Sequence, residues 1–537
     1  MKGIKRSLIM LLAISLVITM FVGCVASQKD ESPKGQSEAT QSAQGNEKNY
    51  VNEEGFPIVN EPITLSVLVT NRGFSERYLV KEYERMTGIR MDFTEIEKSG
   101  MEEKINIILA SNDLPDVFMK CRFGYNDLTR YATDGAFLNI KPYMDNYAPN
   151  LKDTLARYDD VKRSITLPDN GIYGYPDILD ADTQNMGNKL FFNKKWLDAA
   201  GLDVPGTIDE FHNVLLAFKG LDMNGNGEQD ELPFTALEWY TPFGLFRGAW
   251  GLGNRGRGND HIDLDEETGK LRFYPADERE KEALQFYNKL YNDGLLDPDI
   301  FLKQNDTLVA KGDQGLVGST VRGNHTIIST TNYNDYVPLK QALIGPHGDQ
   351  LYSGVKPRLK LHGNYVVTTV CKYPEAAIRW VDYFYGDEGI KFYFLGIEGK
   401  TYYVDENGEY QYTDEVLNDK DSSYFMFGGT GTTSIKVDKY LIDEGSKGPT
   451  LEAAINFKPY APKEIWAQFT YTAEELDELL GLTADIDNYV HEMEVQFIVG
   501  RKPFSEWNDY VNTLKKMDLD RFMEINQAAY ERYQSIK

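Results

Sequence analysis

Hydrophobic and polar residues alternate along the chain in a way that predicts strands and helices in turn between residues 65 and 119. Residues 65–69 and 89–93 alternate as strands, and residues 75–87 between them carry apolar side chains at helical spacing. A second helix is predicted over residues 100–111, and a short strand over residues 117–119. This β-α-β alternation favours a parallel sheet with helices on both faces.

Two later stretches carry aromatic and aliphatic side chains at helical spacing, and the first opens at Pro374, a residue that suits the first turn of a helix. Stripes of this kind are typical of helices that pack on a core, so we expect structural roles for both. They consist of Ala377, Trp380, Val381 and Phe384, and of Trp507, Tyr510, Val511 and Leu514.

The first 52 residues predict export and attachment. Three basic residues precede an apolar run over residues 8–22, which is shorter than the roughly 20 residues that span a bilayer comfortably, so residues 1–23 are predicted to be a signal peptide. Gly23 and Cys24 resemble a bacterial lipobox, in which Cys24 becomes the lipidated N-terminus. Residues 24–52 are rich in polar side chains and are predicted to be a disordered tether.

Composition narrows the class of protein. The 485 residues from 53 to 537 exceed the usual size of a single core, which favours two lobes. A net charge of −26 argues against a nucleic-acid partner, because phosphate contacts need basic patches. Of the three cysteines, Cys121 and Cys371 remain once Cys24 is set aside, and each lies beside a strand-like run, so two buried free thiols are predicted.

Residues 222–231 have the spacing of a calcium loop. Side-chain oxygens recur at alternate positions, Gly227 stands where such a loop turns sharply, and Pro233 occupies the position of the closing Glu of an EF-hand. A structural Ca²⁺ site is therefore predicted without a second EF helix, and the alternative is a metal-free Asx-rich turn. The predicted ligands are Asp222, Asn224, Asn226, Glu228 through its main-chain carbonyl, Asp230 and Glu231.

Several segments together resemble the family 1 extracellular solute-binding proteins of ABC transporters, and in particular the LplA-like lipoproteins and the alginate-oligosaccharide-binding proteins. The resemblance runs from about residue 60 to the end of the chain. Its segments are Asn112–Phe118, Ile172–Pro176, Leu190–Leu197, Pro205–Phe211, Gly345–Gly348, Cys371–Ala377, Gly396–Gly399, Phe497–Arg501 and Gln527–Tyr530.

The resemblance implies an α/β fold with two lobes of the periplasmic-binding-protein type II, each lobe a mixed sheet flanked by helices. Lobe 1 is expected to comprise residues 53–180 and 362–450, and lobe 2 residues 181–361 with the calcium loop, while residues 451–537 form helices shared with lobe 2. The implied protein is a monomer, lipid-anchored on the extracellular face of a Gram-positive-type membrane, which passes an oligosaccharide to an ABC permease.

Sugar rings stack on aromatic side chains, and their hydroxyls pair with charged or amide groups, so cleft residues are expected on loops at strand ends. For each candidate, a core position or a solvated charge is the alternative, and Arg255 and Arg257 are further groups that could meet a uronate carboxylate. The candidates are Lys120, Arg122, Phe123, Tyr125 and Asn126, then Trp239, Tyr240, Phe243, Arg247 and Trp250, and finally Asn364 and Tyr365.

An enzyme is the main alternative, because surface-anchored glycosidases and lyases share this location and acidity. With 83 Asp and Glu residues, the sequence cannot single out a catalytic pair. His491 and Glu492 begin a zinc-protease motif, but the second His is missing, and the glycines of residues 251–256 lack the strand and helix of a dinucleotide site. No catalytic residue is predicted, and the absence of repeats argues against an adhesin.

Overall fold

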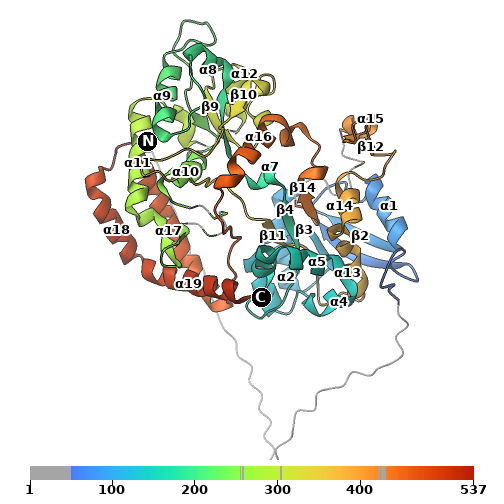
Figure 1. Ribbon diagram of the computed structural model, residues 1–537. Coiled ribbons are helices and arrows are strands. Elements are labelled where there is room, and N and C mark those ends of the chain that lie inside the picture. The colour runs from blue at the N-terminus through green and yellow to red at the C-terminus, as the bar shows by residue number, and fades with distance from the viewer. Residues whose placement is uncertain are drawn as a thin grey trace, which may run out of the picture. The chain divides into compact units, whose positions relative to one another are not determined.

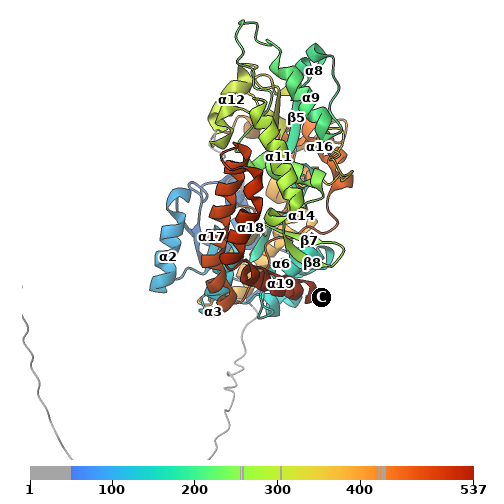
Figure 2. The same cartoon turned by 90° about the vertical axis from the view of Figure 1, so that its left-hand side faces the viewer.

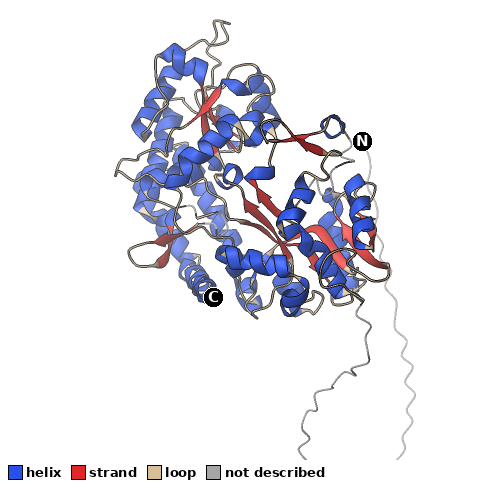
Figure 3. Ribbon diagram, turned by 45° about the vertical axis from the view of Figure 1, so that its right-hand side comes forward, coloured by secondary structure: helices blue, strands red, loops and turns tan. Residues whose placement is uncertain are grey.

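Two sheets organise the described part of the chain (Figure 3). One has six strands and the other four. Two short hairpins are separate from them, namely β7 (Ile262–Asp265) with β8 (Lys270–Phe273) and β12 (Tyr402–Val404) with β13 (Tyr410–Tyr412). None of the helices in this part is long and apolar enough to cross a membrane. The computed structural model describes residues 50–253, 255–256, 259, 261–302, 305–420, 424 and 431–537.

The six-stranded sheet is mixed, with the order β14-β4-β11-β3-β1-β2. Strand β1 pairs in parallel with β2 and β3, as the alternation of the first segments predicts, whereas β11 runs antiparallel to both of its neighbours. The strands are β1 (Ile63–Val69), β2 (Ile89–Glu95), β3 (Val117–Phe123), β4 (Tyr175–Asp180), β11 (Leu359–Val367) and β14 (Ile435–Val437).

Helices cover both faces of this sheet, and the residues of β1 show why. Val67 and Val69 point into one core, while Leu68 points into the other, so a run of apolar residues replaces the alternation of a half-exposed strand. Helices α1 (Tyr78–Thr87) and α13 (Pro374–Asp382) contribute to the first core, and α2 (Met101–Ser111) and α3 (Tyr125–Thr133) to the second (Figure 1). The predicted helices and strands of residues 65–119 are confirmed.

The second sheet has the order β10-β5-β9-β6, with one parallel and two antiparallel pairings, and is therefore mixed as well. Helix α9 begins with a capping box, in which Thr207 and Glu210 each accept from the other's main-chain N–H. The elements are β5 (Lys189–Asn193), β6 (Thr235–Ala236), β9 (Ser319–Arg322), β10 (Tyr336–Pro338), α8 (Lys194–Ala200), α9 (Ile208–Lys219), α10 (Tyr240–Phe246), α11 (Glu278–Asn292) and α12 (Asn305–Asp313).

The C-terminal helices α17 (Ala473–Ile498), α18 (Trp507–Lys516) and α19 (Leu519–Ser535) share a hydrophobic core with the second sheet. Helix α17 lies against α11, and α18 and α19 complete the layer (Figure 2). Trp507, Tyr510 and Leu514 are buried in this core, and the predicted stripe on α13 is buried under the first sheet. Both predicted core stripes are confirmed.

The first crossing between the sheets is held by a buried ammonium group. The chain leaves β4 at Asp180, passes through α7 (Asp182–Asn185) and enters β5 at Lys189. The Lys189 Nζ donates to the carbonyls of Thr183, Gly187 and Gly323 at 2.7, 3.0 and 3.0 Å. Burial lowers the pKa of Lys189 to about 7.

Cys121 and Cys371 are both buried and unpaired, which confirms the prediction of two free thiols. Burial raises the pKa of each thiol to about 12, so both stay protonated at neutral pH. They act as small apolar side chains of the core.

Candidate functional site

The end of β3 is irregular at the place where the sequence predicts cleft residues. Lys120 and Arg122 both have φ of 59°, a left-handed conformation that side chains other than glycine seldom adopt. Opposite them, β11 shifts register, since Gly363 pairs with Phe123 and Tyr365 with Met119. A bulge and two strained residues at one strand end are features that cluster at functional sites.

Lys120 lies inside this irregular segment among other charged groups. Its side chain is fully buried, and its Nζ stands 5.6 Å from the centre of the Phe74 ring. Burial lowers the pKa of Lys120 to about 7, and the nearby Arg77 adds to the effect. Asp177 on β4 is also buried, accepts from the Thr432 N–H at 3.0 Å and lies 3.6 Å from Lys360.

Asn364 occupies the bulge of β11. Its side chain is 1% exposed, yet its amide nitrogen and oxygen have no hydrogen-bond partner within the described residues. An unpaired buried amide costs on the order of 1–3 kcal/mol, so such groups are rare unless something else pairs with them. Both amide atoms therefore lack a partner among the described residues, and neither is exposed to solvent in this structure.

A cavity of 340 Å³ opens beside Tyr125 and Asn126 at the start of α3. The Tyr125 ring packs 5.5 Å from that of Tyr471 and 5.7 Å from that of His362, which stands two residues before Asn364 on β11. Burial lowers the pKa of His362 to about 4, so its imidazole is neutral. The cavity therefore combines an aromatic wall from Tyr125 and Tyr471 with polar groups from Asn259 and Gln468.

The predicted aromatic cluster of residues 239–250 divides between surface and core. Trp239 is half-buried at the start of α10, where its ring lies 5.9 Å from the His491 ring, and Tyr240 is 38% exposed. Phe243 is buried and stacks on Tyr287 at 4.0 Å. The first two residues thus stand near solvent and the third belongs to the core.

Arg247 and Trp250 lie in the core of the second sheet. The Arg247 guanidinium donates to Glu280 at 2.7 Å and to Glu494 at 2.8 Å, and these two carboxylates offset its charge. Trp250 is 3% exposed and packs against Phe286. Their spacing from Phe243 follows one helical face, which is a signal of core positions, whereas the sequence analysis placed these residues among the cleft candidates.

Arg255 is also engaged within the protein. It is 5% exposed, and it pairs with Asp263 at 2.9 Å and with Glu266 at 3.0 Å. Tyr365, in contrast to its neighbour Asn364, donates to the Ala377 carbonyl and belongs to the core. Arg257 and Cys24 lie outside the described residues.

The loop of residues 222–231 gathers its oxygen atoms within one turn between α9 and β6. Asp222 accepts from the N–H groups of Gly225 and Gly227 at 2.8 and 3.0 Å, and Asp230 accepts from the amides of Asn224 and Asn226 at 3.0 and 3.1 Å. No group of three or more His, Cys, Asp and Glu side chains that could hold a metal is found among the described residues. The carboxylates of Asp222, Asp230 and Glu231 in this loop are therefore not gathered into such a group in this structure.

Glu231 gives this loop an unsatisfied atom. Its Oε1 accepts from the Met223 N–H at 2.7 Å, whereas its Oε2 is buried and has no hydrogen-bond partner within the described residues. A buried carboxylate oxygen without a donor needs a cation or a proton. The chemistry of the loop therefore fits Ca²⁺, which prefers oxygen ligands of these kinds.

Comparison with known proteins identifies the family. The family model of the bacterial extracellular solute-binding protein matches residues 70–391, which is more than half of the chain. The chain belongs to this family. Among curated relatives, the fructooligosaccharide ABC transporter substrate-binding protein FusA of Streptococcus pneumoniae serotype 4 is 26% identical over 506 residues, covering 88% of this chain and 90% of FusA. Lipoprotein LipO of Bacillus subtilis is 24% identical over 479 residues, covering 84% and 88% of the two chains.

Solved structures show the same architecture. S. pneumoniae FusA in complex with kestose superposes with a TM-score of 0.71 at 25% identity, covering 88% of this chain and all of that one. A FusA EF-hand mutant in complex with fructo-nystose has a TM-score of 0.69 at 25% identity, with coverages of 88% and 100%. This solute-binding protein therefore has the two-lobe type II fold, with the six-stranded sheet in lobe 1 and the four-stranded sheet in lobe 2.

Several polar groups near the candidate cleft of this solute-binding protein were not predicted from the sequence. Asp177 on β4 accepts from the Thr432 N–H, His362 lies beside Tyr125, and Gln468 and Asn259 line the Tyr125 cavity. The only local signal was the segment Ile172–Pro176, which directly precedes Asp177. Pairing between distant strands, not local pattern, brings these groups together.

The buried position of Arg247 predicts a structural effect. Arg247→Met leaves Glu280 and Glu494 buried without their cation, so the free energy of unfolding should fall by about 3–5 kcal/mol. Urea denaturation measures this change. As a control, Arg72→Met removes an exposed arginine that pairs with Glu97 and should leave stability close to wild type. Equal stability of Arg247→Met and wild type would contradict the role assigned to Arg247.

Proposed function

We propose that this protein captures an oligosaccharide between its two lobes and delivers it to an ABC permease. One relative, FusA, is named for fructooligosaccharide transport, and a FusA structure with bound kestose also supports the class of ligand. Lobe 1 would comprise residues 53–180 and 362–450, and lobe 2 residues 181–361 with the C-terminal helices of residues 451–537. We expect the protein to act as a monomer.

The observation that carries this proposal is the unpaired amide of Asn364 beside the strained end of β3. A sugar hydroxyl both donates and accepts, so it can satisfy the two amide atoms at once. Tyr125 and Tyr471 offer ring faces to the apolar side of a sugar ring. Lys120 and Arg122 lie at the same end of β3 and would contact the ligand from lobe 1. Trp239 and Tyr240 would contact it from lobe 2.

Closure of the lobes would follow from contacts of the ligand with both of them. A ligand shifts the balance between open and closed states only by its differential affinity for the two, and a sugar held from both sides has that property. The permease would then recognise the closed state. The ligand acts as the bridge between the lobes.

The substitution Asn364→Leu should change oligosaccharide affinity and protein stability in different ways. The variant should lower oligosaccharide affinity by about 1–3 kcal/mol, because sugar hydroxyls lose their partner. Its stability should be unchanged or higher, because the amide has no partner to lose in the free protein. Calorimetric titration with a fructooligosaccharide and thermal melting measure the two effects.

Asn193 provides the matched control for Asn364. It is also buried, but its side chain accepts from the Lys195 N–H at 3.0 Å, so Asn193→Leu should lose stability and keep its sugar affinity. If Asn364→Leu binds the sugar as tightly as wild type, Asn364 is not in the cleft. If no oligosaccharide binds to wild type, the proposed function is wrong.

We propose no catalytic activity, in keeping with a family of solute-binding proteins. A surface-anchored glycosidase or lyase remains the alternative, and it makes a different prediction for the bound sugar. Incubation with oligosaccharides, followed by mass analysis, should return the sugars unchanged. Shortened products in proportion to protein concentration would favour the enzyme.

We also propose a structural Ca²⁺ ion in the loop of residues 222–231. Asp222, Asn224, Asn226, Asp230 and Glu231 would hold it through side-chain oxygens, and Glu228 through its carbonyl. The bound ion would supply charge neutralisation for the three acidic ligands that lie in one turn. The unpartnered Glu231 Oε2 and the existence of a FusA EF-hand mutant support this proposal.

Removal of calcium should lower the melting temperature by a few degrees, since an ion that binds only the folded state stabilises it by mass action. Asp222→Ala should abolish the response to EDTA and leave sugar affinity nearly unchanged. The exposed Asp153, which has no hydrogen bond or ion pair within the described residues, offers the control Asp153→Ala. A wild-type melting curve that does not respond to EDTA would contradict the site.

The proposed location is the extracellular face of the membrane, with a lipid on Cys24. Cys24→Ser removes the acceptor thiol, so the protein should move from the detergent phase to the aqueous phase on phase partitioning. Its sugar affinity should be unchanged, because Cys24 lies in the predicted tether, and only the end of that segment packs on the folded part, where Val51 is buried and bridges Val59. Equal partitioning of variant and wild type would contradict lipidation.

A further inference from the structure

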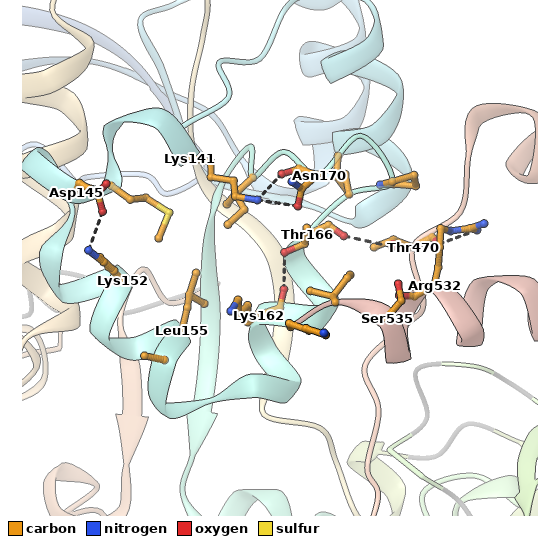
Figure 4. Close-up of a pocket in the computed structure, with 17 residues that line it drawn as sticks. Lys141, Asp145, Lys152, Leu155, Lys162, Thr166, Asn170, Thr470, Arg532 and Ser535 are labelled. Carbon is orange, nitrogen blue, oxygen red and sulfur yellow. Dashed lines mark hydrogen bonds and ion pairs between the residues drawn. The ribbon is translucent and has the colours of Figure 1, made fainter. Parts of the chain in front are cut away.

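A second cavity, of 680 Å³, lies outside the candidate cleft (Figure 4). Its walls come from the helices α4 (Met144–Tyr147), α5 (Pro149–Arg157) and α6 (Asp159–Ile165) of lobe 1 and from the end of α19. None of the residues that line it is among the predicted sugar-binding residues. Its volume lies within the range of small-molecule sites, which is roughly 300–1,000 Å³.

The charge of this cavity is opposite to that of the chain. The chain has a net charge of −26, whereas five basic side chains and a single acidic one, Asp145, line the cavity. A concave site of one sign focuses the field and attracts ions of the other sign. The basic residues are Lys141, Lys152, Lys162, Arg532 and Lys537.

Two of these basic groups already have carboxylate partners. Lys152 pairs with Asp145 at 2.7 Å, and Arg532 pairs with Glu475 and donates to the Thr470 carbonyl at 3.3 Å. These pairs hold the walls in place but contribute little net charge.

Lys141 and Lys162 carry charge that no carboxylate offsets. Lys141 donates to the side chain and the carbonyl of Asn170, at 2.7 and 2.8 Å, and both acceptors are neutral. Lys162 is half-buried, and no hydrogen bond or ion pair of its ammonium group occurs within the described residues. Both side chains reach the cavity from different elements (Figure 4).

The acidic neighbours of Lys162 on its own helix have other partners. Asp159 pairs with Arg163 at 2.6 Å, and Asp160 pairs with Arg358 at 3.2 Å. Asp169, in the loop that borders the cavity, accepts from the Tyr173 hydroxyl and from the Gly171 N–H. The cavity therefore keeps a positive charge that an external anion can neutralise.

We propose that this cavity binds a phosphate-bearing ligand. Ammonium groups act as point charges that converge on a compact, multiply charged anion, whereas planar carboxylates are matched by the fork of an arginine, and the one arginine here is occupied by Glu475. The apolar side chains of Met144, Leu155 and Ile172 line the same cavity and would contact the body of a phosphate ester.

Calorimetric titration of the purified protein with inorganic phosphate and with glycerol phosphate, at low ionic strength, tests the proposal. Both should bind wild type saturably, Lys162→Gln should bind on the order of ten-fold more weakly, and Lys162→Glu should not bind. Melting without phosphate should be the same for all three, because Lys162 has no partner to lose. The control Lys104→Gln, at an exposed position on α2, should bind like wild type.

The same series of variants can distinguish a phospholipid headgroup from a soluble phosphate ester as the ligand. Vesicles of anionic phospholipid are added to protein that carries Cys24→Ser, so that no lipid anchor contributes to binding. Vesicle binding that is lost in Lys162→Glu identifies a lipid headgroup as the ligand, and binding of only the soluble phosphates identifies a free one.

Absence of binding to every phosphate probe, or binding that is equal in wild type and Lys162→Glu, would overturn the proposal. Neither result would contradict the proposed sugar site, because the two sites share no residue. Accordingly, Asn364→Leu should bind phosphate as wild type does.

Discussion

The site depends on one pairing, the insertion of β11 between β3 and β4. This strand returns to the first sheet after the chain has built most of the second lobe, and it is antiparallel to both neighbours. In its pairing with β3, the single residue Asn364 lies opposite the three β3 residues 120–122, which include the left-handed Lys120 and Arg122. Without that pairing, the strained end of β3 and the unpaired amide would not be neighbours.

The ionisable groups that are removed from solvent in this protein are of two kinds. Some have hydrogen-bond or ion-pair partners within the protein, and others have none among the described residues. Arg247 donates hydrogen bonds to Glu280 and Glu494, and the Lys189 Nζ donates hydrogen bonds to three carbonyl oxygens. Both side chains therefore have partners within the protein. Lys162 and the Glu231 Oε2 lack partners within the described residues. Since a polar group that is removed from water without a partner is costly, the second kind supports the proposals of a ligand beside Lys162 and of an ion beside Glu231.

The first crossing between the sheets is fixed by two kinds of contact. Lys189 ties it to the end of β9 through hydrogen bonds to carbonyl groups, which are directional. Met186 of the same crossing packs in the hydrophobic core of the second sheet. Polar and apolar contacts together therefore set the path of this segment.

The sequence by itself determined the local elements and the family. Periodicity predicted α1, α2, α13 and α18, because each of these helices must turn one apolar face toward a core, and the order of the family segments indicated the two-lobe fold. The calcium loop is likewise a prediction from local sequence, since all of its proposed ligands lie within ten residues. Only the tertiary structure decided which candidates are buried in a core and which are exposed. Trp250 and Tyr240 look alike in sequence, but one is 3% and the other 38% exposed. The reason is that burial depends on which distant elements pack against a residue, and that is a property of the pairing of strands far apart in the chain.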